Sequence, residues 1–122
     1  MDTILFNDML EKFTEYDFHD ASLFSISYNY KDELLQLSIT HFRGTNTNNL
    51  DIMIRSDLCF EKTENLSIDN VYELFFLKPE INSFEEKNDG DVPYYELIGI
   101  AGWVLKFEAG NLYYSEEVIG EY

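Results

Sequence analysis

The chain of 122 residues is 45% hydrophobic and 16% aromatic, and its 24 acidic residues against eight basic ones give it a formal net charge of −16. The hydrophobic content excludes a disordered acidic tail and predicts one folded domain over residues 1–122. The negative field disfavours nucleic acid and anionic membrane surfaces as partners, because both carry dense negative charge. It favours a basic protein partner, or it serves only solubility.

The N-terminal segment predicts an amphipathic helix over about residues 2–14, with Asp2 or Thr3 as its N-cap. Apolar side chains recur at spacings near three and four, which places them on one side of the helix. They are Ile4, Leu5, Met9, Leu10 and Phe13. The apolar run 4–6 is too short for a signal peptide, and no stretch approaches the roughly 18 apolar residues of a membrane span. We therefore expect a cytoplasmic protein.

His19 and Asp20 lie at the junction between this helix and the first predicted strand. A histidine beside a carboxylate can act as a general base with its orienting partner, and metal binding is the other chemical alternative. Neighbouring residues on a strand point to opposite faces, however, so adjacency in the sequence does not bring the two side chains together. We favour a structural junction, in which Asp20 accepts hydrogen bonds from nearby backbone N–H groups.

After this junction the hydrophobic pattern changes to a period of two, which is typical of half-buried strands. The alternating apolar residues are Phe24, Ile26, Tyr28 and Tyr30 in a first run and Leu35, Leu37 and Ile39 in a second. The charged segment 31–33 makes a turn between them, so the two runs predict a hairpin. His41 shares the parity of the second run, and we interpret it as a structural residue at the edge of the core face.

Further short apolar runs, separated by turn residues at intervals of about 8–12 residues, predict strands through a β region of about residues 21–117. They cover Leu50–Arg55, with 57–60 either continuing that strand or forming the next one, then about 70–77, Ile81–Glu86, Tyr94–Ile100, Trp103–Glu108 and Leu112–Glu116. Residues 118–122 are expected to fray. A helix followed by seven or eight antiparallel strands is a mainly β (α+β) fold, either a sandwich or one strongly bent sheet.

The sequence contains no motif that indicates a catalytic residue, a metal or a cofactor. Its six glycines match neither phosphate-binding pattern, and no serine lies in a nucleophile elbow. Two histidines and one cysteine are too few for the usual zinc site. Four acidic residues around a turn (Glu85, Glu86, Asp89 and Asp91) do not match the EF-hand loop and are interpreted as a solvated hairpin tip. We expect no metal and no cofactor.

Tyrosines set among carboxylates mark the C-terminal third. Residues 88–122 hold seven acidic residues and one basic residue, together with five tyrosines. Rings among carboxylates are the chemistry of a surface that binds a basic protein. The candidate partner-binding residues are Asp89, Asp91, Tyr95, Glu96, Tyr114, Glu116 and Glu117. In the alternative interpretation, each tyrosine doublet places one ring inward and one outward on a strand.

The segment Phe18-His19-Asp20-Ala21 leads into a strand with the pattern Ile26-Ser27-Tyr28, and a leucine-rich return strand follows. This combination resembles small bacterial proteins, some of which are grouped with the immunity proteins of polymorphic toxin systems. The resemblance covers mainly residues 16–42. It implies an acidic single-domain inhibitor that binds a toxin, and it implies no catalytic residues.

We therefore expect an acidic binding protein that inhibits a basic toxin domain, such as a nuclease. One alternative is a structural β domain that self-associates through an exposed sheet edge. The other is a hydrolase that uses His19 and Asp20.

Overall fold

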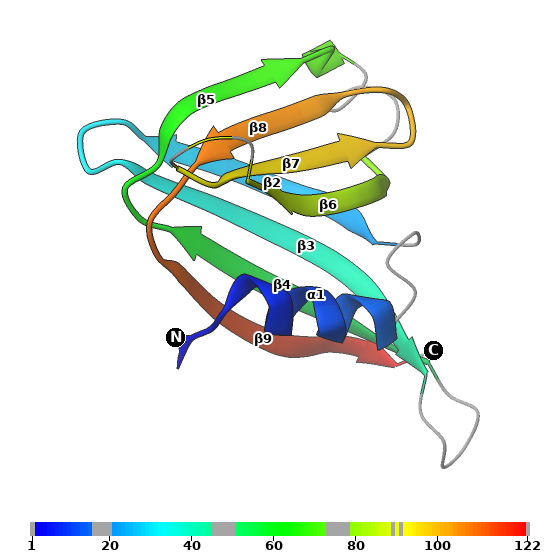
Figure 1. Ribbon diagram of the computed structural model, residues 1–122. Coiled ribbons are helices and arrows are strands. Elements are labelled where there is room, and N and C mark those ends of the chain that lie inside the picture. Colours follow the sequence, from blue (N-terminus) through cyan, green and yellow to red (C-terminus); the bar gives the residue numbers. More distant parts are fainter. Residues whose placement is uncertain are drawn as a thin grey trace.

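The computed structural model describes residues 2–15, 21–44, 51–72, 79–88, 90 and 92–121. Within them the chain forms an α-helix and nine β-strands (Figure 1). In chain order these elements are β1 (Asp2–Thr3), α1 (Phe6–Glu15), β2 (Ser22–Asn29), β3 (Leu34–Gly44), β4 (Asp51–Phe60), β5 (Glu64–Asp69), β6 (Ile81–Lys87), β7 (Tyr94–Gly99), β8 (Val104–Glu108) and β9 (Leu112–Glu121). Eight strands follow α1, so the predicted mainly β fold is confirmed.

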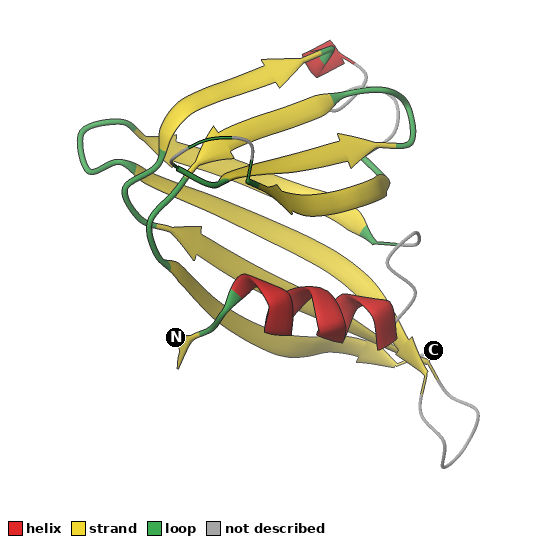
Figure 2. Cartoon of the chain, in the orientation of Figure 1, coloured by secondary structure: helices red, strands yellow, loops and turns green. Residues whose placement is uncertain are grey.

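The strands form two sheets on either side of the core (Figure 2). Sheet A has the order β1-β9-β4-β3-β2, and sheet B has the order β5-β8-β7-β6. Neighbouring strands run antiparallel throughout both sheets. Figure 1 shows α1 beside sheet B, in front of β4 and β9 of sheet A. Two packed sheets correspond to the sandwich, one of the two architectures that the sequence pattern allows.

One bent ribbon connects the two sheets. β4 of sheet A continues into β5 of sheet B through residues 61–63, and β8 of sheet B returns into β9 of sheet A through residues 109–111. The backbone ladder persists in this corner, because Glu61 N donates to Asn111 O and Gly110 N donates to Glu61 O, both at 2.8 Å. The bend therefore leaves these backbone groups paired.

The core lies between the sheets and under α1. β3 supplies Leu35, Leu37 and Ile39 to it, as its alternation predicts. Five aromatic rings cluster in its centre, with the centroids of contacting rings 4.7–6.4 Å apart: Phe6, Phe60, Phe84, Tyr95 and Phe107. Trp103 is also fully buried, and a Cβ atom at Gly99 would lie 2.0 Å from its ring. Only glycine fits at that position without moving the indole.

The helix begins later than predicted. Asp2 and Thr3 do not cap it but pair as β1 with β9, opposite Tyr114 and Tyr113. The first helical bond runs from Met9 N to Leu5 O, at 3.2 Å. Leu5 therefore precedes the helix rather than joining its apolar face, and its side chain is 73% exposed. Phe6 and Met9 are buried as expected, and Leu10 packs against the core.

β2 contains a bulge that changes which of its residues face the core. Its register with β3 shifts between Leu23 and Ser25, so one extra residue, Phe24, is inserted there. Because an inserted residue reverses the alternation, Leu23 and Ile26 both pack in the core. The predicted inward position of Phe24 is therefore wrong, and its side chain is 67% exposed.

The prediction of a strand over about residues 70–77 is wrong for residues 70–72. Residues 73–77 lie outside the described chain. The strand instead comes earlier, as β5, in which Leu66 and Ile68 are half-buried. Asn70 then takes a φ of 57°, which ends the strand because this left-handed region interrupts an extended chain. Val71 and Tyr72 follow Asn70 and lie in a helical turn, although β-branched and aromatic residues such as these led to the prediction of a strand.

β4 is continuous over Asp51–Phe60, so residues 57–60 extend it, which is one of the two alternatives that the sequence left open. The last strand is longer than predicted. β9 continues to Glu121 instead of fraying after Glu116, because its last residues pair with the first residues of β4.

Candidate binding surface

The outward side chains of sheet B form a surface on which carboxylates surround a tyrosine. Tyr94 lies between Lys87 of β6 and Glu108 of β8, and in the next row Glu96 lies between Glu85 and Lys106. We call this surface the acidic face. It consists of Glu64, Asp69, Glu85, Glu96 and Glu108 with Lys87, Lys106, Ser67 and Tyr94. Five carboxylates against two lysines leave it strongly negative.

The two lysines separate carboxylates that the sheet register brings together. Glu85 and Glu96 lie directly opposite one another, an arrangement of like charges that destabilises a sheet. Lys87 Nζ lies 3.0 Å from Glu85 Oε2, and Lys106 Nζ lies 3.9 Å from Glu96 Oε2. The hydrogen bond and the charge of Glu85 raise the pKa of Lys87. Both lysines are thus paired with carboxylates of the acidic face. The other carboxylates of the face give it its negative charge.

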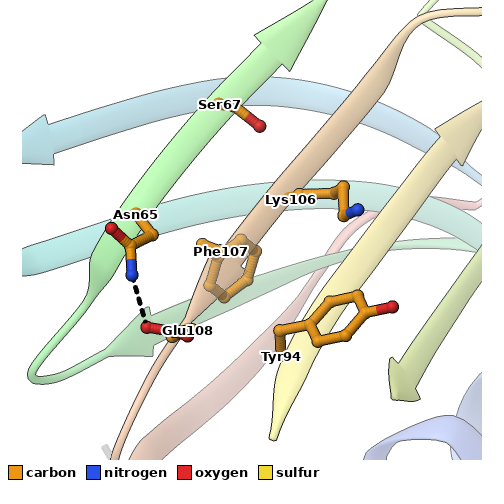
Figure 3. A pocket seen from close by; sticks show the side chains of 6 residues that line it. All are labelled: Asn65, Ser67, Tyr94, Lys106, Phe107 and Glu108. Carbon is orange, nitrogen blue, oxygen red and sulfur yellow. Dashed lines mark hydrogen bonds between the residues drawn. The ribbon is translucent and has the colours of Figure 1, made fainter. Parts of the chain in front are cut away.

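A hollow of about 460 Å³ opens on this face between β5, β8 and β7 (Figure 3). It is lined by Asn65, Ser67, Tyr94, Lys106, Phe107 and Glu108. The β5–β8 register is irregular between Glu64 and Ser67, and Asn65 within that irregularity has a φ of 54° and donates to Glu108 Oε2 at 2.7 Å. Lys106 Nζ lies 5.0 Å from the centroid of the Tyr94 ring. An aromatic ring and a carboxylate in its lining make this hollow chemically suited to lysine or arginine side chains.

The predicted partner-binding tyrosines are not on the surface. Tyr95 and Tyr114 are only 6% and 5% exposed and belong to the core. Successive strand residues face opposite sides, so their neighbours Tyr94 and Tyr113 are the partly exposed members of the two doublets. In both doublets one ring therefore faces inward and the other outward, as the alternative interpretation predicts.

The predicted acidic residues do not meet on one surface. Glu96 belongs to the acidic face, whereas Glu117 extends from sheet A, where its Oε1 lies 3.0 Å from Arg55 Nη2. Glu116 accepts a hydrogen bond from the hydroxyl of Tyr114. The remaining candidates, Asp89, Asp91, His19 and Asp20, lie outside the described residues.

A hydrogen-bonded chain of polar side chains crosses β3, β4 and β9 on the core side of sheet A. His41 Nε2 and Ser56 Oγ are 2.9 Å apart, and Ser56 Oγ lies 3.2 Å from the Tyr114 hydroxyl, which donates to Glu116. His41 is buried as its parity predicts. Ser56 was missed by the sequence analysis, although it shares the parity of Ile54 and Leu58, two core residues. Its side chain has no solvent exposure, so it has no access to a substrate.

Within the described ranges, no group of three or more His, Cys, Asp or Glu side chains is arranged to hold a metal ion. No helix in that part of the chain is both long and apolar enough to cross a membrane. Comparisons with family models, curated proteins and solved structures found no match to this chain.

Proposed function

We propose that the chain is a cytoplasmic, immunity-type inhibitor that binds a basic toxin domain, such as a nuclease, through its acidic face. The observation that carries this proposal is the hollow between β5, β8 and β7, whose lining combines the Tyr94 ring, the Lys106 ammonium near that ring and the carboxylate of Glu108. The resemblance of residues 16–42 to immunity proteins supports the same class of function.

Lys106 occupies the position that a partner's cation would take. Its ammonium lies near the Tyr94 ring and 3.9 Å from Glu96, a distance longer than a close ion pair. An arginine of the partner can stack on Tyr94 and bind Glu108 in a bidentate manner, while Lys106 moves towards Glu96. A tyrosine that becomes fully desolvated in this way is typical of a binding hot spot.

The charge of the whole molecule supports rapid and selective association with such a partner. A net charge of −16 attracts a basic protein over long distances and repels nucleic acid, which the same partner would otherwise bind. The burial of Ser56 argues against hydrolysis by the His41–Ser56 pair, the one serine–histidine hydrogen bond among the described residues. We therefore propose binding rather than catalysis.

The test uses the purified protein encoded by the gene next to that of this chain, with binding measured by isothermal titration calorimetry. We expect Tyr94→Ala and Glu108→Gln each to weaken binding by about tenfold or more, as for hot-spot residues. Glu117→Gln is the matched control, because it removes one exposed carboxylate from sheet A and should leave the affinity nearly unchanged. Raising the NaCl concentration from about 0.05 M to about 0.5 M should weaken binding of the wild type.

Two results would contradict the proposal. One is the absence of binding by the wild-type chain, and the other is an affinity that does not respond to salt. If Glu117→Gln weakens binding as much as Glu108→Gln does, the acidic face is not the specific contact.

A further inference from the structure

Most of the hairpin of β2 and β3 carries no formal charge, in contrast to the rest of the molecule. No Asp, Glu, Lys or Arg occurs from Ser22 to Tyr30, and none occurs from Leu34 to Phe42. The charged residues of this hairpin lie in the turn between the strands and at the far end of β3, where Arg43 is the next to last residue. Charged residues make up 26% of the whole chain, so two runs of nine residues without any are a local departure from its composition.

Among the described strands, β2 is also an edge of sheet A. It pairs with β3 on one side, and on the other side only its beginning contacts sheet B, where Leu23 N donates to Pro79 O at 2.9 Å. From Phe24 to Asn29, no other strand of the described chain pairs with this edge. Edge strands are usually protected from further pairing by charged side chains or proline, and this segment contains neither.

The other edges of the two sheets carry carboxylates. β5 contains Glu64 and Asp69, and β6 contains Glu85 and Glu86. β9 extends well beyond its short pairing with β1 and carries Glu116 and Glu117 in that extension. A basic partner is attracted to those edges, whereas a second copy of this chain is repelled from them.

We propose that β2 pairs antiparallel with β2 of a second copy of this chain, which joins two copies of sheet A into one continuous sheet. Two molecules of charge −16 can approach closely only where neither presents a charge, and the β2 edge meets this condition. The exposed rings of Phe24 and Tyr30, at the two ends of the strand, supply apolar surface for the contact.

The regular part of β2 defines the register of this pair. Residues 25–29 pair with β3 without interruption, and Ser27 is their midpoint. A twofold axis through this midpoint places Ser27 opposite its own symmetry mate, Ser25 opposite Asn29, and Ile26 opposite Tyr28. The side chains that meet on the outer face are then all small, polar and uncharged.

The first experiment is sedimentation equilibrium of the purified full chain at low and high NaCl concentration, from about 0.05 M to about 0.5 M. Salt screens the repulsion between two acidic copies, so we expect the dimer to become tighter as salt increases, the opposite of the response expected for a basic partner. Ser27→Asp places two carboxylates face to face and should raise the dimer dissociation constant by about tenfold or more. Ser67→Asp on β5 makes the same change in charge on an edge of sheet B and should leave that constant unchanged.

The second experiment tests the register by oxidation. In a Cys59→Ser background, which removes the native cysteine, Ser27→Cys should form a disulfide between two copies, whereas Ser67→Cys should not. A chain that stays monomeric at high salt overturns the proposal, as does equal crosslinking of both cysteine variants. Protection of the β2 amides from hydrogen exchange only when a basic toxin domain is added would assign the edge to that partner's strand and would also overturn it.

Discussion

Tyr94 and Tyr95 are adjacent in the chain but lie in different environments, because successive residues of β7 face opposite sides of sheet B. Tyr94 contributes its ring to the hollow of the acidic face. Tyr95 packs against Phe6 and Phe107 in the core, with ring centroids 4.8 and 5.4 Å apart. The same residue type therefore lines a surface hollow at one position and packs in the core at the next.

The Tyr95 phenol should make the stability of the protein depend on pH in the alkaline range. Burial, with the charge and hydrogen bond of Glu86, raises the pKa of Tyr95 from 10.0 to about 12. The unfolded chain loses this proton first, so the stability that Tyr95 contributes is complete below pH 10 and is lost as the pH rises to about 12. Urea denaturation should show a steeper loss between these pH values for the wild type than for Tyr95→Phe.

Tyr94→Phe is the control for this measurement, because it removes a partly exposed phenol from the opposite face of the same strand. It should keep the steep alkaline loss of the wild type. If Tyr95→Phe and the wild type lose stability in parallel, the Tyr95 phenol ionises equally in the folded and unfolded chains, and the prediction is wrong.

At the scale of elements, the first residue of α1 joins the helix to the sandwich through aromatic contacts. The Phe6 ring contacts Phe84 of β6 and Tyr95 of β7, with centroids 5.1 and 4.8 Å apart. Phe6→Ala should lower the free energy of unfolding by about 3 kcal/mol or more, because it leaves a cavity among these rings. Leu5→Ala, one residue earlier and mostly exposed, should change it by less than about 0.5 kcal/mol.

Chemical denaturation of both variants, with far-ultraviolet circular dichroism to confirm that they fold, measures this difference. Equal losses for Phe6→Ala and Leu5→Ala would mean that the helix is held by general hydrophobicity rather than by the aromatic contact.

Elements with an unbroken alternation could be predicted from the sequence. The core side of β3 follows directly from the spacing of Leu35, Leu37 and Ile39. β2 could not be assigned in this way, because the bulge at Phe24 reverses its alternation and depends on pairing with β3. The same limit applies to β1, whose two residues are extended only because they pair with β9 at the far end of the chain.

The acidic face was only partly predictable for a related reason. Glu96 was selected because it lies in an acidic and tyrosine-rich part of the sequence. Glu64 and Asp69 belong to the same face but come from β5, which is separated from Glu96 in the sequence and joins it only through the register of β8 with its neighbours. A surface built from four strands depends on that register, and local sequence patterns do not contain it.

At the scale of the whole molecule, the charge is unevenly distributed. Carboxylates gather on the acidic face and on the edges of sheet B, whereas the β2–β3 hairpin has none within its strands. The acidic face and the neutral edge belong to different sheets, so a basic partner and a second copy of the chain can bind without competing for the same side chains. Salt should separate the two contacts, because it screens attraction in one and repulsion in the other.

The same charge should make the folded chain itself more stable in salt. A net charge of −16 repels itself most strongly when the chain is compact, and added ions screen this repulsion. We expect the Tm to rise by about 4 °C between about 0.01 M and about 0.3 M NaCl, which corresponds to roughly 1 kcal/mol in a domain of this size. Differential scanning calorimetry on Ser27→Asp keeps salt-driven dimerisation out of this measurement. The double variant Glu64→Gln with Asp69→Asn removes two charges from the acidic face and should reduce this rise in Tm. A Tm that falls as salt increases would contradict the prediction, because it would mean that the ion pairs of Lys87 and Arg55 outweigh the repulsion.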